Sequence, residues 1–228
     1  MLELDGVRKA YGDVDAVDGV SLRIGGGQFH CLLGPNGSGK TTLLRLLLGL
    51  TNPTVGSVSG PDGAVGCGFQ EPNFYPGLTV RENIEVFASL VGAHDGEWRR
   101  RLVSQLRLER ALDRPAADLS GGFARKLDLA LALLNRPEYL LLDEPLGALD
   151  DVSKDRLLAL LADYADGHTV VVSTHHVTDF EPFVDRVTVM HEGAVVVDRD
   201  RATIDLGGDG SLQEYYIQLV LDRAGSGE

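Results

Sequence analysis

The stretch Gly34-Pro35-Asn36-Gly37-Ser38-Gly39-Lys40-Thr41-Thr42 has the residue types and spacing of a phosphate-binding loop, G-x-x-x-x-G-K-[ST]. Its glycines allow a tight turn that brings backbone N–H groups against phosphate oxygens. The Lys40 amine can reach the outer phosphates, and the Thr41 hydroxyl can ligate the Mg²⁺ that holds them. The stretch therefore predicts a nucleoside triphosphate site, with a plain glycine turn between two elements as the alternative.

Two carboxylates and a histidine add chemistry to such a site. Asp143 and Glu144 follow the apolar run 139–142. An acid at a buried strand end can hold Mg²⁺ through water, and the next acid can orient or deprotonate an attacking water. His175 could contact a γ-phosphate, but spacing alone does not distinguish it from its neighbour His176.

The segment Ser120-Gly121-Gly122 opens a periodic helical stretch. A hydroxyl, backbone N–H groups and the positive end of a helix dipole make a second anion site, although an ordinary serine N-cap has the same pattern. One chain with two phosphate-binding helix ends predicts a head-to-tail pair of copies, in which each copy completes the other's site with twofold symmetry.

The elements that must position these residues alternate between strands and helices. Short apolar runs at 29–33, 64–69, 139–142 and 169–173 are typical of buried strands. The alternation predicts an α/β fold with a mainly parallel sheet covered on both faces. Ligands bind such sheets at the carboxyl ends of the strands. Because Gly34, Gln70, Asp143 and His175 each follow a predicted strand, we expect them near one site.

Further elements follow from local patterns. Residues 1–28 alternate apolar and polar positions, which predicts short antiparallel strands, and Tyr11 between them could stack on a nucleotide base or simply pack. Thr79 and Glu82 form a capping-box pattern. Helices are also predicted over 42–49, 79–91 and 94–112, in a stretch that 118–122 open and Pro137 stops, and around the leucines at 157–161. The remaining predictions are a hairpin turning at Glu192-Gly193, a linker at 207–210 and an amphipathic segment over 212–221.

The composition limits the function classes. The chain has 228 residues and a net charge of −13, which argues against nucleic-acid binding and against adhesion to anionic lipid. We expect no signal peptide, no membrane span and, with two cysteines outside any C-x-x-C pattern, a reducing cytoplasm. The surface is rich in Asp and poor in Lys, which fits a cytoplasm at high salt or an Arg-preferring genome.

Over nearly its whole length the chain resembles the nucleotide-binding subunit of ATP-binding-cassette (ABC) transporters. Gly34 to Thr42 match the Walker A loop, and Leu119 to Gly122 match the signature motif that binds the γ-phosphate across the dimer. Leu140 to Asp143 match Walker B. The resemblance further implies an adenine-stacking Tyr11, a Q-loop Gln70 that senses Mg²⁺ and the attacking water, a catalytic Glu144, a D-loop Asp150 and a switch His175, with Asp185-Arg186 ten residues later.

The resemblance implies a P-loop NTPase (RecA-like) core with an antiparallel β subdomain, formed by 1–71 and 137–206, a helical subdomain over 72–136, and a tail over 207–228. It also implies ATP and Mg²⁺ as ligands, with Thr41, Gln70 and Asp143 at the metal. The chain would form a homodimer or a heterodimer and lie in the cytoplasm on the inner membrane face, docked on a separate permease.

Two departures from the family pattern bear on the subfamily. Phe123 replaces a frequent glutamine and Leu131 replaces a common arginine. Phe123 and the ending Ser211 to Tyr216 resemble the subfamily of drug, polysaccharide and ABC-2-type exporters. Three alternatives remain: an importer ATPase, a soluble ABC ATPase acting on nucleic acid or ribosomes, and a non-hydrolysing ATP-binding module.

Overall fold

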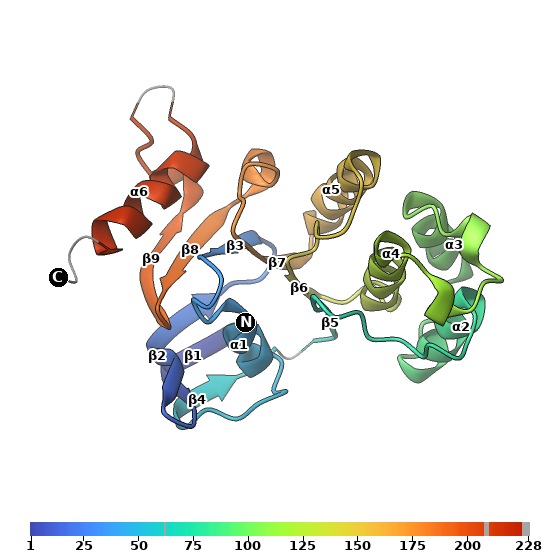
Figure 1. Ribbon diagram of the computed structural model, residues 1–228, viewed down its shortest axis with the longest axis horizontal. Coiled ribbons are helices and arrows are strands. Elements are labelled where there is room, and N and C mark those ends of the chain that lie inside the picture. Colours follow the sequence, from blue (N-terminus) through green and yellow to red (C-terminus); the bar gives the residue numbers. More distant parts are fainter. Residues whose placement is uncertain (62, 208–209, 225–228) are drawn as a thin grey trace. The chain divides into compact units, whose positions relative to one another are not determined.

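The computed structural model of the protein describes residues 1–61, 63–207 and 210–224. The chain forms two compact units, one of Met1–Asp62 with Val171–Glu228 and the other of Gly63–Val170. The division falls inside strand β7 (Thr169–Thr174). Figure 1 shows the order of the elements along the chain.

The first unit contains an antiparallel sheet in the order β2-β1-β4. Strands β1 (Leu2–Tyr11) and β2 (Val14–Ile24) pair with Leu4 opposite Leu22, and β4 (Val55–Ser59) pairs with the other edge of β1. The predicted antiparallel strands are thus confirmed. Strand β4 was not predicted, because the turn residues Pro53 and Gly56 flank or interrupt it and its side chains are mostly exposed.

The same unit contains the strands β7-β3-β8-β9 in that order. All five residues of β3 (Phe29–Leu33) are buried, and β3 pairs in parallel with β8 (Arg186–His191). The predicted hairpin of β8 with β9 (Ala194–Asp200) is confirmed. Glu192 and Gly193 both have a positive φ, 47° and 80°, as a two-residue hairpin turn requires.

Among its described residues, two α-helices and two short 3₁₀ helices complete the first unit. Helix α1 (Lys40–Leu47) follows β3 and starts two residues earlier than predicted, and α6 (Leu212–Ala224) covers the predicted amphipathic segment. The short helices are η3 (Glu181–Phe183) and η4 (Arg201–Thr203). Residues 208–209 of the predicted linker and 225–228 of the tail lie outside the described residues.

The second unit places helices around a parallel pair of strands, β5 (Val65–Gly68) and β6 (Tyr139–Asp143). Its helices are α2 (Val80–Leu90), α3 (Gly96–Gln105), α4 (Gly121–Ala132) and α5 (Asp151–Ala165), with short turns η1 (Glu109–Ala111) and η2 (Ala116–Asp118). The predicted capping box at Thr79 and Glu82 is present. The boundaries predicted for a helical subdomain over 72–136 stay a prediction.

Aromatic residues anchor the helices of this unit. The Trp98 indole donates to the Leu133 carbonyl at 2.8 Å, and the Tyr164 hydroxyl donates to the Pro137 carbonyl at 2.5 Å. Both polar tips are therefore satisfied although the rings are buried. Across the described ranges, no helix is both long and apolar enough to cross a bilayer.

Candidate functional site

The phosphate-loop stretch lies between a buried strand and a helix, as predicted. β3 ends at Leu33, the loop follows, and α1 begins at Lys40. The Lys40 amine donates to the carbonyl oxygens of Gly34 at 2.7 Å and Pro35 at 3.0 Å. These bonds hold its positive charge over the loop, where the backbone N–H groups at the start of α1 also favour an anion.

Two glycines of the loop are required by their surroundings. Gly39 has φ 101°, and a Cβ there would collide with the Ala16 carbonyl oxygen. A Cβ on Gly34 would collide with Ser38 Oγ and with the Met190 carbonyl oxygen. The Ser38 hydroxyl is buried and, within the described chain, has no hydrogen-bond partner. The two glycines let the loop pass close to Ala16 and Met190, and the unpartnered Ser38 hydroxyl fits a phosphate with its metal.

Tyr11 lies at the end of β1 and is 49% exposed. The Lys9 amine lies 4.9 Å from the centre of its ring, in cation–π range. One alternative in the sequence was that Tyr11 simply packs. Its ring is instead accessible, so it can stack on a base.

The two histidines after β7 differ in how far they are exposed. His175 is half-buried and His176 is exposed, with their ring centres 4.3 Å apart. Thr174 Oγ1 donates to the His176 carbonyl at 3.0 Å and accepts from the His176 N–H at 3.1 Å. This turn fixes the backbone on both sides of His175.

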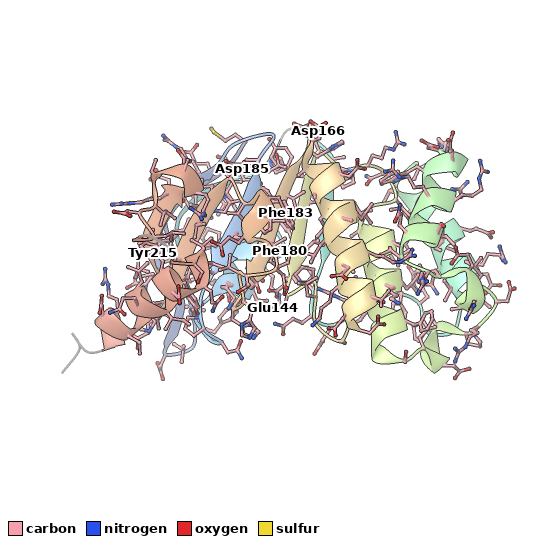
Figure 2. All side chains as sticks on the ribbon, turned by 90° about the horizontal axis from the view of Figure 1, so that it is seen from above. Glu144, Asp166, Phe180, Phe183, Asp185 and Tyr215 are labelled. Carbon is pink, nitrogen blue, oxygen red and sulfur yellow. The ribbon has the colours of Figure 1, made fainter. Side chains whose placement is uncertain are left out.

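Helix α6 holds the same segment from the other side. Its Gln213 side-chain oxygen accepts from the Val177 N–H at 2.8 Å, and the Leu212 N–H donates to Glu181 at 2.9 Å. Figure 2 labels Phe180 and Phe183 in this segment, and their rings pack edge-on with centres 6.1 Å apart. No sequence pattern had indicated that α6 contacts this segment.

In the second unit, three predicted residues follow two paired strands. Because Gly68 of β5 pairs in parallel with Leu142 of β6, Gln70 and the acids Asp143 and Glu144 leave the same edge. Asp143 is 1% exposed, whereas Gln70 is exposed and Glu144 half-buried. Glu144, labelled in Figure 2 after β6, has φ 47°. A left-handed backbone at a non-glycine residue costs energy and often occurs where a side chain must be aimed.

Arg125, which was not predicted as a site residue, lies at the centre of this edge. Its guanidinium donates to the carbonyl oxygens of Phe69, of Asp143 at 2.7 Å and of Pro145 at 3.2 Å. Phe69 directly precedes Gln70, and Asp143 and Pro145 lie on either side of Glu144. A signal was present in the sequence, since Arg125 and Asp128 are opposite charges three residues apart in an otherwise apolar stretch of helix.

The two charges form a buried ion pair, 3.2 Å apart. Asp128 also accepts from the Asn73 N–H at 3.0 Å. Burial raises the pKa of Asp128 to about 6, opposed by the Asn73 hydrogen bond and the Arg125 charge. Burial also lowers the pKa of Arg125 from its usual value, opposed by the charge of Asp128. The pair thus connects the segment after β5 to helix α4.

The Ser120-Gly121-Gly122 segment begins α4, with Ser120 as N-cap residue. The alternative of an ordinary serine cap is not what forms, because the Ser120 side chain makes no cap hydrogen bond and is exposed. A Cβ on Gly122 would lie 3.0 Å from the Ala148 carbonyl oxygen. The second glycine therefore permits the close approach of α4 to the loop after β6.

Asp150 ends that loop as the N-cap of α5. One oxygen accepts from the Ser153 N–H at 2.9 Å and the other accepts from the Ser153 hydroxyl at 2.9 Å. The backbone hydrogen bond from Ser153 lowers the pKa of Asp150 below its usual range. Asp150 therefore has a structural use within this chain.

Within the first unit, the loop at 34–42 and His175 follow neighbouring strands, β3 and β7. Within the second, Gln70, Asp143 and Glu144 share one edge, and Ser120 and Asp150 begin helices α4 and α5. This arrangement of a phosphate loop after a buried strand and acids after a parallel pair defines a P-loop NTPase.

The comparisons with known proteins identify the family. The sequence model of the family described as "ABC transporter" matches residues 17–147, more than half of the chain. The chain is 38% identical to the Nod factor export ATP-binding protein I of Ralstonia nicotianae over 211 residues, which cover 85% of this chain and 65% of that protein. It is 39% identical to the aliphatic sulfonates import ATP-binding protein SsuB 1 of Nocardia farcinica, covering 90% and 87%.

Solved structures agree with the sequence relatives. One titled "Structure of ATP binding subunit of ABC transporter" superimposes with a TM-score of 0.85 at 28% identity, covering 96% of this chain and 99% of that one. The ATP-binding cassette MJ0796, in a dimeric post-hydrolysis state bound to ADP and Pi, superimposes with a TM-score of 0.77 at 32% identity, covering 88% and 98%.

The chain belongs to the ABC transporter family. It is an ATP-binding and ATP-hydrolysing cassette of that family, and the predicted fold class, a P-loop NTPase α/β fold, is confirmed.

Proposed function

We propose that this chain powers a separate membrane permease by hydrolysing ATP between two cassettes, and that two copies of the chain form the pair. The observation that carries the proposal is the exposed start of α4. The Ser120 hydroxyl makes no cap hydrogen bond, although a serine in that position usually does. A hydroxyl and helix N–H groups left available to solvent suit a phosphate brought by another molecule.

The proposed roles follow the predicted residues. In one copy, Tyr11 stacks on the adenine and Gly34 to Thr42 bind the phosphates. Mg²⁺, held by Thr41, Gln70 and Asp143, neutralises the charge that develops on the β- and γ-phosphates. The second copy contributes Ser120, Gly121 and Gly122 at the γ-phosphate, and its Asp150 lies in the loop beside it.

The hydrolytic step requires a water in line with the γ-phosphate. Glu144 accepts a proton from that water or orients it, while Gln70 and His175 hold the water and the γ-phosphate in place. The left-handed backbone of Glu144 supports this role, because non-glycine residues in that conformation cluster at active sites. The isolated copy is then nearly inactive, because its own α4 start serves the other nucleotide.

The Nod factor export relatives favour an exporter, and the sulfonate import relative keeps an importer as the second candidate. We place the chain in the cytoplasm, on the inner membrane face through the permease. The segment from Gln70 to Val91 faces the coupling helix of that partner. The net charge of −13 favours specific docking on protein over binding to nucleic acid or lipid.

The variant Glu144→Gln tests the proposal. It should still bind ATP, lose about 10²–10⁴-fold in turnover, and accumulate an ATP-dependent dimer in size-exclusion chromatography, because only the proton acceptor is removed. Hydrolysis at the wild-type rate would refute the role of Glu144. If the variant stays monomeric with ATP alone but dimerises when a second cassette is added, the functional pair is a heterodimer and not a homodimer.

A further inference from the structure

The second unit contains a polar cavity of about 840 Å³ between α4, the start of α5 and the turn after α3. Four cationic side chains line it against two carboxylates: Arg107, Arg110, Lys126 and Arg156, and Glu109 and Asp150. The cavity thus has a positive balance in a chain whose net charge is −13. Its lining residues lie outside the phosphate loop, and one of them, Asp150, also belongs to the proposed nucleotide site.

Lys126 is the unusual member of this set. Its side chain is 7% exposed, yet within the described residues its amine makes no hydrogen bond and no ion pair. The contact that it does make is with the Phe123 ring, whose centre lies 5.1 Å from the amine. The amine itself is not among the buried polar atoms without a partner, so it is open to solvent and has unused capacity to bind an anion.

The carboxylate of Asp150 does not fill that capacity. Both of its oxygens accept hydrogen bonds from Ser153, and it attracts Lys126 only through a longer-range charge interaction. The N-cap of α5 therefore uses the acid that would otherwise pair with the lysine.

The arginines of the cavity are also available. In the part of the chain that the structure describes, the guanidinium groups of Arg107, Arg110 and Arg156 make no ion pair. Arg107 follows helix α3 with φ 55°, a left-handed backbone, and its side chain lines the cavity. Guanidinium forks and an ammonium group together match the several acceptor oxygens of a phosphate.

We propose that this cavity, which we call the Lys126 cavity, binds a small phosphate-bearing molecule. The phosphate is held by Lys126 and the arginines, and the rest of the ligand lies along the Phe123 ring. The cavity volume lies in the range of small-molecule sites and exceeds what a single phosphate fills. A bound ligand would connect α4 to α5, the helices that begin with Ser120 and Asp150. This inference does not depend on the proposed transport role.

The test uses the full chain carrying Lys40→Ala, so that phosphate binding at the phosphate loop is weakened. Inorganic phosphate, phenyl phosphate and neutral phenol are titrated by calorimetry at constant ionic strength. We expect saturable binding of both phosphates, tighter for phenyl phosphate, and none of phenol. Adding Lys126→Gln should weaken binding about 10–100-fold, because one charge-assisted contact is lost.

The matched control is Lys154→Gln, which removes the same charge from α5, where Lys154 lies 3.7 Å from Asp151 and outside the cavity. It should change the affinity by less than about twofold, since an exposed charge is screened. Lys126→Arg should retain binding. The proposal fails if no phosphate binding saturates, or if Lys126→Gln and Lys154→Gln weaken it equally. Should Lys126→Gln not fold, Arg156→Gln decides, and an unchanged affinity there overturns the proposal.

Discussion

The guanidinium of Arg125 donates a 2.7 Å hydrogen bond to the carbonyl oxygen of Asp143, the residue directly before Glu144. The same guanidinium bonds the Phe69 carbonyl, directly before Gln70. One side chain of the signature helix α4 thereby holds the backbone at two predicted catalytic residues. Arg125 is a positioning residue, because it acts through the groups it holds.

We expect Arg125→Lys to lower kcat about 10–100-fold with little change in the KM for ATP. An ammonium group cannot span three carbonyl oxygens, and a misplacement near 1 Å can cost that much in rate. The phosphate loop, which should set the KM, is untouched. Steady-state ATPase kinetics measure both constants. Arg101→Lys is the control, since Arg101 pairs with the exposed Asp163 at the surface.

A second pair of variants separates positioning from stability. Arg125→Met should destabilise the protein by about 3–5 kcal/mol, because it leaves the buried Asp128 charge without its partner. Arg125→Met with Asp128→Asn removes that charge and keeps an acceptor for the Asn73 N–H, so much of the stability should return. If kcat returns with it, Arg125 is merely structural.

The contrast between Lys40 and Arg125 shows which parts of the site could be predicted from the sequence and which could not. The phosphate loop depends on a contiguous pattern, so its strand, glycine positions and helix could be predicted. The bonds of Arg125 reach carbonyl oxygens 18, 20 and 56 residues away, and backbone acceptors leave no residue-type signal. Likewise, the alternation that predicted β1 and β2 is missing from β4, whose outer position leaves its side chains exposed.

The buried His30 predicts a loss of stability in mild acid. Its Nε2 lies 2.7 Å from Thr188 Oγ1, and because that hydroxyl donates to Asp198, Nε2 is the donor. Nδ1 is buried and has no partner in the described structure. Burial lowers the pKa of His30 from 6.5 to about 4, with the Arg186 charge acting in the same direction and that of Asp198 against it.

Because the folded pKa lies below the unfolded one, the unfolded chain binds the proton first. Stability from this group is complete above pH 6.5 and is lost as the pH falls toward 4. The full effect is about 3 kcal/mol. Urea unfolding of the wild type and of His30→Gln between pH 7.5 and 4 measures it. The difference between the two proteins should shrink with acid; a constant difference would contradict the buried neutral histidine.

Gln213 predicts a coupling of α6 to the His175 segment. The N–H of Val177, a fully buried residue, donates to the Gln213 side chain. Gln213→Ala leaves that group unsatisfied, which should cost about 1–3 kcal/mol and lower kcat several-fold as His175 loosens. Gln213→Glu keeps an oxygen acceptor and should restore both. Gln218→Ala, whose partner is the exposed Asp222, is the control and should change neither.

The acidic surface predicts a strong salt dependence of stability. With a net charge of −13, self-repulsion acts over about 10 Å at 0.1 M salt and about 3 Å at 1 M. We expect the thermal midpoint to rise between low and molar KCl. Equal thermal midpoints at all KCl concentrations would contradict the high-salt interpretation. The Arg-preferring genome would then be the explanation of the Asp-rich, Lys-poor composition.

Helix α5 provides a local version of the same test. Asp166 follows its last turn, which contains no basic residue, whereas Asp151 lies in its first turn. Figure 2 labels Asp166 at the end of the helix. A negative charge is unfavourable at a helix C-terminus and favourable at the N-terminus. Asp166→Asn should therefore stabilise by about 0.3–1 kcal/mol at low salt, and Asp151→Asn should destabilise. Both changes in stability should become smaller in molar KCl, because salt screens an exposed charge from the helix dipole. If they persist, the salt dependence of stability has a cause other than charge screening.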